Sequence, residues 1–171
     1  DSGRTFSGAM TNRPIALVPA VRDASAATIV SLLDGRPYTA GTAITAEGEH
    51  ELSVTATDCA GNRSEQSVRF TIDRTPPQLL SIVPPNDATV GAEPQITGTT
   101  SPDGIRLVVE PRGAFFAVNN GGFVIDNLQL GEGVHELELV ASDSAGNEVR
   151  FPYRVTVRLT APVLEIVENG S

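Results

Sequence analysis

The sequence contains no lysine, no tryptophan and one cysteine, and these shortages exclude several kinds of site. The single thiol of Cys59 cannot form an internal disulfide or a zinc site built from several cysteines. All twelve basic residues are Arg, and the formal net charge of −9 repels phosphate backbones, so we expect no nucleic-acid partner. No signal peptide or long apolar stretch is visible, so we expect no membrane insertion.

Aromatic residues are also scarce, at 5% of the chain, and aliphatic residues with Thr supply most of the core-forming side chains. Their β-branched members fit the surface of a sheet, and the dispersed 16 Gly and 12 Pro are typical of many turns. The motifs G-x-S-x-G and H-E-x-x-H are absent. We therefore expect an all-β protein that is not an enzyme and needs no cofactor.

A segment of sixteen residues occurs twice, as EGEHELSVTATDCAGN at 47–62 and EGVHELELVASDSAGN at 132–147. Ten of the sixteen positions are identical at an offset of 85 residues. Apolar and polar residues alternate within each copy, which predicts a strand with one buried face. A second alternating run follows each copy, at 68–72 and at 153–157, so each repeat predicts a β-hairpin closed by Ala-Gly-Asn.

Shorter apolar runs between turn residues predict further strands. The expected ranges are 15–18, 27–33 and 37–44 in the first half, and 78–83, 94–99, 104–110, 114–118 and 122–126 in the second half. Regular short strands separated by turns are typical of a β-sandwich.

The run DGRPYTAGTAITAEGEHELSVTATDCAGNRSEQSVRFTIDRTPP resembles the bacterial immunoglobulin-like repeats of large surface and secreted proteins. Those repeats typically end in an Asp-x-Ala-Gly-Asn hairpin, a strand ending in Asp, and a Thr-Pro-Pro linker. PQITGTTSPDGIRLVVE in the second half resembles the opening of such a module. The resemblance implies tandem immunoglobulin-like β-sandwich domains at the cell surface or outside the cell, where such modules act as stalks, spacers, adhesins or appendages of enzymes.

The repeat offset also sets the expected domain boundaries. We expect one module at 1–74, a second at 75–159, and a further segment at 160–171 that is a linker with one extra strand. Two prolines in the linker 73–77 are expected to hold it extended.

The same turn closes both hairpins, and its chemistry predicts a structural role. The residues concerned are Asp58, Gly61 and Asn62 in the first copy, and Asp143, Gly146 and Asn147 in the second. The carboxylate is expected to accept backbone N–H groups, while Gly supplies a positive φ. The alternative is calcium bound by Asp58, Asn62 and Asp73, which the resemblance to calcium-stiffened rods implies, although these residues lack a compact ligand spacing.

Other polar residues have simpler expected roles. His50 and His135 begin matching strands in separate modules, so we expect each ring to cap a core and not to bind metal. Cys59 aligns with Ser144, which indicates a tolerant position and not a nucleophile. Asp34 is expected to be a solvated loop residue.

The first and last segments of the sequence differ from the repeat. An apolar run at 78–83 follows the Thr-Pro-Pro linker, and an equivalent run, with Val163, Leu164, Ile166 and Val167, follows the second linker. No such run precedes the first module. Cutting from a longer array explains this, and so does β-strand addition, in which residues 160–171 of one copy complete the first module of the next copy.

Two functional classes remain open. The first is a structural or adhesive surface module whose partners are neighbouring modules or other copies of itself, possibly as a head-to-tail filament. The alternative is a module that binds a surface glycan or a protein as an accessory of a larger secreted protein. That alternative predicts an exposed aromatic platform, for which Phe115, Phe116 and Phe123 are the candidates, although core packing explains them equally well.

Overall fold

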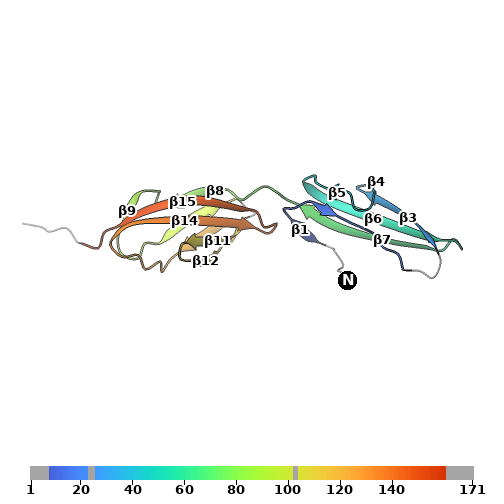
Figure 1. Ribbon diagram of the computed structural model, residues 1–171. Coiled ribbons are helices and arrows are strands. Elements are labelled where there is room, and N and C mark those ends of the chain that lie inside the picture. The colour runs from blue at the N-terminus through green and yellow to red at the C-terminus, as the bar shows by residue number, and fades with distance from the viewer. Residues whose placement is uncertain (1–7, 23–25, 102–103, 161–171) are drawn as a thin grey trace, which may run out of the picture. The chain divides into compact units, whose positions relative to one another are not determined.

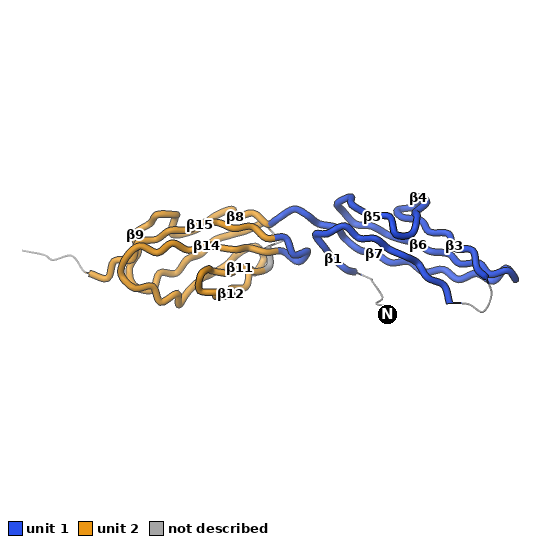
Figure 2. Tube along the Cα trace, viewed as in Figure 1, with its two compact units in different colours: residues 1–76, 143–147 blue, residues 77–142, 148–171 orange. Residues whose placement is uncertain are grey.

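The computed structural model describes residues 8–22, 26–101 and 104–160 (Figure 1). Every regular element in these ranges is a β-strand, which confirms the expected all-β class. No helix in the same ranges is long and apolar enough to cross a membrane. The chain forms two compact units, one of residues 1–76 with 143–147, the other of residues 77–142 with 148–171 (Figure 2).

The first unit contains two sheets of unequal size. Its strands are β1 (Ala9–Thr11), β2 (Ile15–Ala16), β3 (Ala27–Leu33), β4 (Arg36–Pro37), β5 (Ala43–Ile44), β6 (Gly48–Asp58) and β7 (Arg63–Ile72). The larger sheet has the order β1-β7-β6-β3-β4, and the smaller sheet contains β2 and β5.

The second unit repeats this plan with a larger second sheet. Its strands are β8 (Leu79–Val83), β9 (Ala88–Val90), β10 (Ile96–Thr100), β11 (Gly104–Glu110), β12 (Ala114–Ala117), β13 (Gly122–Ile125), β14 (Gly133–Asp143) and β15 (Glu148–Val157). The larger sheet has the order β12-β11-β14-β15-β9, and the smaller has the order β13-β10-β8.

The duplicated segment forms the long hairpin of each unit, β6–β7 and β14–β15. Gly48 pairs with Ile72 in the first hairpin, and Gly133 pairs with Val157 in the second, so both hairpins keep the register that the 85-residue offset predicts. The alternating apolar residues of these strands face one side because successive side chains of a strand point to opposite faces.

The two smaller sheets show which strand one unit has and the other lacks. Ile15 pairs with Ile44 between β2 and β5, and Ile96 pairs with Ile125 between β10 and β13, so these two ladders correspond at an offset of 81 residues. In the second unit, β8 adds to β10 as an antiparallel edge strand. The described part of the first unit contains no strand that pairs with β2 at the corresponding edge.

The cores differ accordingly. In the second unit, buried side chains from both sheets form one cluster, consisting of Ile96, Leu107, Val109, Val118, Phe123, Ile125, Leu128, Leu130, Leu137, Leu139, Ala141, Tyr153, Val155 and Val157. Leu79 and Ile82 of β8 pack against this cluster. Among the described residues of the first unit, the cluster has only Ile44, Phe70 and Ile72 as buried members.

Two local expectations differ from the structure. The single strand expected over 37–44 is wrong, because a turn at Thr39–Thr42 separates β4 from β5. The hydroxyl of Tyr38 stabilises this turn by donating to the carbonyl of Thr42, at 2.7 Å. The three-residue strands β1 and β9, which run parallel to the ends of β7 and β15, are too short to produce an alternating pattern.

Candidate functional site

An apolar groove with a volume of about 730 Å³ lies in the first unit. One wall is the segment 17–22, which directly follows β2. The floor is the inner face of the β6–β7 hairpin, including Leu52, Val54, Ala56 and Val68. All residues that line the groove belong to the first unit.

The second unit shows what covers the same surface when β8 is present. Leu139 and Ala141 are fully buried there, whereas their counterparts at the 85-residue offset, Val54 and Ala56, are only half-buried. Ile29 lies on the same face of β3 as the core-packed Leu33, and its side chain is 41% exposed. Apolar surface that is buried in the second unit is therefore accessible to water in the first.

The wall of the groove presents an open backbone edge. The N–H of Leu17 donates to the Tyr38 hydroxyl at 3.0 Å, and the carbonyl of Leu17 accepts the N–H of Gly41 at 2.9 Å. Both backbone groups of Leu17 thus face the β5 side. Because N–H and C=O groups of successive residues in an extended chain point to opposite edges, those of Val18 face away from β5. The side chain of Val18 is 71% exposed.

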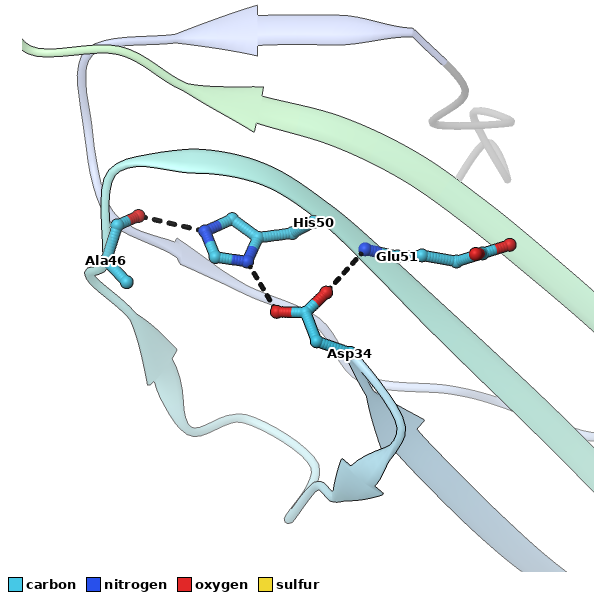
Figure 3. A network of polar contacts seen from close by, with 4 residues as sticks. All are labelled: Asp34, Ala46, His50 and Glu51. Atoms are coloured by element: carbon cyan, nitrogen blue, oxygen red, sulfur yellow. Dashed lines mark hydrogen bonds and ion pairs between the residues drawn. The ribbon is translucent and has the colours of Figure 1, made fainter.

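A second feature of the first unit is a buried histidine held by two acceptors (Figure 3). Nδ1 of His50 lies 2.8 Å from Oδ2 of Asp34, and Nε2 lies 2.9 Å from the carbonyl oxygen of Ala46. The other oxygen of Asp34 accepts the N–H of Glu51 at 2.9 Å. The ring packs against Phe70 with centroids 5.4 Å apart. Asp34 is therefore a partner of His50, and the expectation of a purely solvated loop residue is wrong.

This network shifts both ionisable groups in the direction that favours charge. The hydrogen bond from Asp34 raises the pKa of His50 above 6.5, against the opposing effect of burial. The N–H of Glu51 and the His50 ring lower the pKa of Asp34 below 3.8. His135 occupies the matching position in the second unit, where Nε2 lies 2.7 Å from the carbonyl oxygen of Gly131. The two histidines thus lie in different surroundings despite their equivalent positions.

The two Asp-x-Ala-Gly-Asn turns have the same internal hydrogen bonds. Oδ1 of Asp58 accepts the N–H groups of Ala60 and Asn62, both at 2.8 Å, and Oδ2 accepts the Asn62 side-chain amide at 2.8 Å. Gly61 has φ of 89°, which is favourable for glycine alone among common residues. These bonds lower the pKa of Asp58, with the Asn62 amide as the largest cause.

The second turn repeats the pattern. Oδ1 of Asp143 accepts the N–H groups of Ala145 and Asn147, both at 2.9 Å, and Oδ2 accepts the Asn147 amide at 2.8 Å. Gly146 again has φ of 89°. The carboxylates of both turns are thus engaged by donors of their own turn.

The structure does not bring the three calcium candidates together. Asp58 and Asn62 lie at the turn that joins β6 to β7, whereas Asp73 directly follows the far end of β7. A strand rises about 3.3 Å per residue, so the ten-residue β7 places Asp73 at the opposite end of the hairpin from Asp58. Within the described ranges, no three His, Cys, Asp or Glu side chains cluster closely enough to hold a metal ion.

The remaining predicted residues separate into buried, exposed and undescribed groups. Phe123 is 3% exposed in the core of the second unit, and Phe116 packs against that core, so neither ring offers an exposed platform. Cys59 is a free thiol in an exposed turn. The side chain of Phe115 and the strand-donor candidates Val163, Leu164, Ile166 and Val167 lie outside the described residues.

Sequence reasoning found the missing strand but not the groove that results from it, and it missed the partner of His50. The signal for the groove was the comparison of Val54 with Leu139, in which the smaller side chain belongs to the unit that lacks a strand. No local pattern linked Asp34 to His50, because the contact joins the β3–β4 turn to β6.

Comparisons with known proteins agree with this architecture. Residues 5–74 match the family model of a bacterial Ig-like domain. A search of curated protein sequences found no match. Among solved structures, the fibronectin(III)-like modules of Clostridium thermocellum CbhA have 18% sequence identity and a TM-score of 0.53, over 100% of this chain and 98% of that chain. The fold is therefore of the immunoglobulin and fibronectin type.

More distant structural likenesses extend to cell-adhesion proteins. The eight N-terminal Ig domains of Down Syndrome Cell Adhesion Molecule have 14% identity and a TM-score of 0.44, over 88% of this chain and 23% of that chain. Drosophila N-cadherin EC1-4 has 18% identity and a TM-score of 0.37, over 89% of this chain and 46% of that chain.

Proposed function

We propose that this chain is a structural or adhesive part of an extracellular or cell-surface bacterial protein, built from tandem immunoglobulin-like modules. The match of residues 5–74 to a bacterial Ig-like domain supports this proposal, as does the likeness in fold to fibronectin(III)-like modules. The carboxylates of the repeated turns bond to their own turn, which suits a folding role better than a catalytic one. The module acts through its shape and its contacts with other modules.

The mode of contact that we propose is β-strand addition, in which residues 160–171 of one copy complete the first unit of the next. The observation that carries this proposal is the two-stranded β2–β5 sheet, whose counterpart in the second unit has β8 as a third strand. An open strand edge favours pairing with another chain. A contact between the tail of one copy and the head of the next does not close, so it propagates as a filament.

Sedimentation velocity over a range of protein concentrations tests this function, with negative-stain electron microscopy of the same samples. The intact chain should form multimers that grow with concentration and appear as filaments, and a chain ending at Leu159 should remain monomeric. Multimers of the truncated chain, or an intact chain that stays monomeric at all concentrations, would contradict strand addition. Runs with calcium and with a chelator should give the same distribution, because the Asp58 and Asp143 carboxylates already bond within their turns.

A further inference from the structure

The groove of the first unit has the dimensions and the chemistry of a missing strand, and the second unit shows how such a strand sits. In β8, the side chains of Leu79 and Ile82 pack on the core, while those of Leu80 and Val83 are 62% and 60% exposed. The irregular register between β8 and β10 at Thr99–Thr100 produces this spacing of three residues between the inward side chains.

The sequence of the tail follows the same pattern of inward and outward positions. At the 85-residue offset, Leu79 and Ile82 align with Leu164 and Val167, which are apolar. The exposed Leu80 and Val83 align with Glu165 and Glu168, which are charged. The tail therefore has apolar residues where β8 is buried and carboxylates where β8 is exposed.

Resting on the proposed function, we infer that the groove is the acceptor for residues 163–168 of a second copy, which pair antiparallel with the edge at Ala16 and Val18. In this arrangement Leu164 and Val167 insert over Val54 and Ala56, and Glu165 and Glu168 remain in water. Eleven residues, 161–171, follow the described part of the chain, and six extended residues span about 20 Å, the length of a typical strand.

The register follows from the corresponding ladder in the second unit. There Ser81 pairs with Thr99, and their hydroxyl groups hydrogen-bond at 2.8 Å on the exposed face. The two offsets, 81 for β10 and 85 for β8, place Ile166 opposite Val18. The polar pair of the second unit thus corresponds to an apolar pair in the proposed complex, which covers the most exposed part of the groove wall.

The backbone of the groove wall allows this register to continue. In the second unit, the N–H of Ser101 donates to the carbonyl of Gln78 at 2.8 Å, next to the β8–β10 ladder. The equivalent donor and acceptor are the N–H of Ala20 and the carbonyl of Val163. Pro19, which lacks an N–H, aligns with Thr100, whose N–H bonds to Gly121 on the opposite edge. The proline therefore removes no donor from the edge that receives the strand.

Binding of a synthetic peptide with the sequence of residues 160–171 tests the inference. The acceptor is the full-length chain with Leu164→Asp and Val167→Asp, so that its own tail does not compete, and binding is measured by fluorescence anisotropy. The unmodified peptide should bind. A peptide with Leu164→Asp should bind about tenfold or more weakly, because a leucine side chain is no longer buried, whereas a peptide with Glu165→Gln should bind equally well.

A matched pair of acceptor variants locates the binding surface. Val18→Asp should weaken peptide binding about tenfold or more. Val30→Asp should leave it unchanged, because Val30 is 52% exposed on the other face of β3. No binding, equal effects of the two valine variants, or equal effects of the Leu164 and Glu165 changes would each overturn the inference.

Disulfide trapping tests the register and separates this inference from the broader function. In a Cys59→Ser background, a chain with Val18→Cys and Ile166→Cys should form a ladder of covalent multimers under mild oxidation, and a chain with Val30→Cys and Ile166→Cys should not. If the intact chain forms multimers but neither trapping nor peptide binding depends on Val18, the groove assignment fails while the proposed function stands. An intact chain that is monomeric throughout removes the proposed function and this inference together.

Discussion

The carboxylate of Asp34 lies 2.8 Å from Nδ1 of His50, whose other ring nitrogen faces the carbonyl oxygen of Ala46. A neutral imidazole has one donor and one acceptor nitrogen, whereas a charged imidazolium has two donors. With an oxygen acceptor at each nitrogen, the site favours the charged ring, which agrees with the raised pKa of His50. The structure thus contains a buried charge pair whose stability depends on pH.

The first prediction is that the first unit loses stability as pH rises above about 6.5. A group whose pKa is raised on folding stabilises the fold below its unfolded pKa and loses that effect as pH rises through the folded value. Asp34 has the opposite sign: its contribution is present above 3.8 and disappears as pH falls through its lowered pKa. Urea unfolding followed by NMR signals of each unit, at a series of pH values, measures both limbs.

Asp34→Asn is the matched control for this prediction. The amide keeps the size of the side chain but removes the negative charge, so the pKa of His50 should fall towards its ordinary value and the loss of stability at high pH should diminish. NMR titration of the two histidine rings gives the direct readout. A titration midpoint for His50 that stays the same in the variant would contradict the charge pairing.

The second prediction concerns the turn between β6 and β7. Asp58→Ala removes the acceptor of three hydrogen bonds within the turn, so the unfolding midpoint of the first unit should decrease. Cys59→Ser is the control, because Ser144 occupies the same position in the second turn, and its midpoint should not change. Because folding lowers the pKa of Asp58, the difference between wild type and Asp58→Ala should shrink as pH falls below 3.8.

The third prediction concerns the close contact of β10 with its neighbours in the second unit. A Cβ atom at Gly98 would lie 2.4 Å from both the Phe123 ring and the carbonyl oxygen of Ser81. Gly98→Ala should therefore destabilise the second unit by about 1–3 kcal/mol through overpacking. Gly91→Ala is the control, since nothing lies within 4 Å of its added Cβ. Equal midpoints of the two variants in chemical denaturation would show that β8 or Phe123 moves without cost.

The long hairpins could be predicted from the sequence because both of their signals are local. Alternation of apolar and polar residues defines each strand, and the Asp-x-Ala-Gly-Asn segment defines each turn, so the duplicated segment specifies both strands and their register. The lack of a first strand in one module could also be read from the sequence, since it follows from comparing two aligned copies.

The contacts of the short strands could not be predicted in the same way. β2 and β5 have two residues each, which is too few for a period, and they are held by Tyr38, whose hydroxyl accepts from Leu17 and donates to Thr42. The pairing of Asp34 with His50 joins residues 16 positions apart, through a turn whose sequence is equally consistent with a solvated loop. Such contacts depend on how the sheets pack, and no neighbouring residues report them.

The fourth prediction compares equivalent core positions of the two units. Leu139 is fully buried, so Leu139→Ala should destabilise the second unit by about 2–5 kcal/mol, as the side chain leaves a cavity. Val54 occupies the matching position but lines the open groove, where water fills the space that a truncated side chain leaves. Val54→Ala should therefore cost the first unit clearly less than the loss measured at Leu139, in urea unfolding followed separately for each unit.

Adding the peptide of residues 160–171 should change the result at Val54 and leave the result at Leu139 as it was. A strand seated in the groove buries Val54, so truncating that side chain then removes a contact with the bound strand as well as with the unit itself. The cost of Val54→Ala should rise towards the value expected for a buried valine, because the peptide stabilises the wild-type unit more than the variant. An equal increase in stability of wild type and Val54→Ala on addition of the peptide would place its binding site away from Val54.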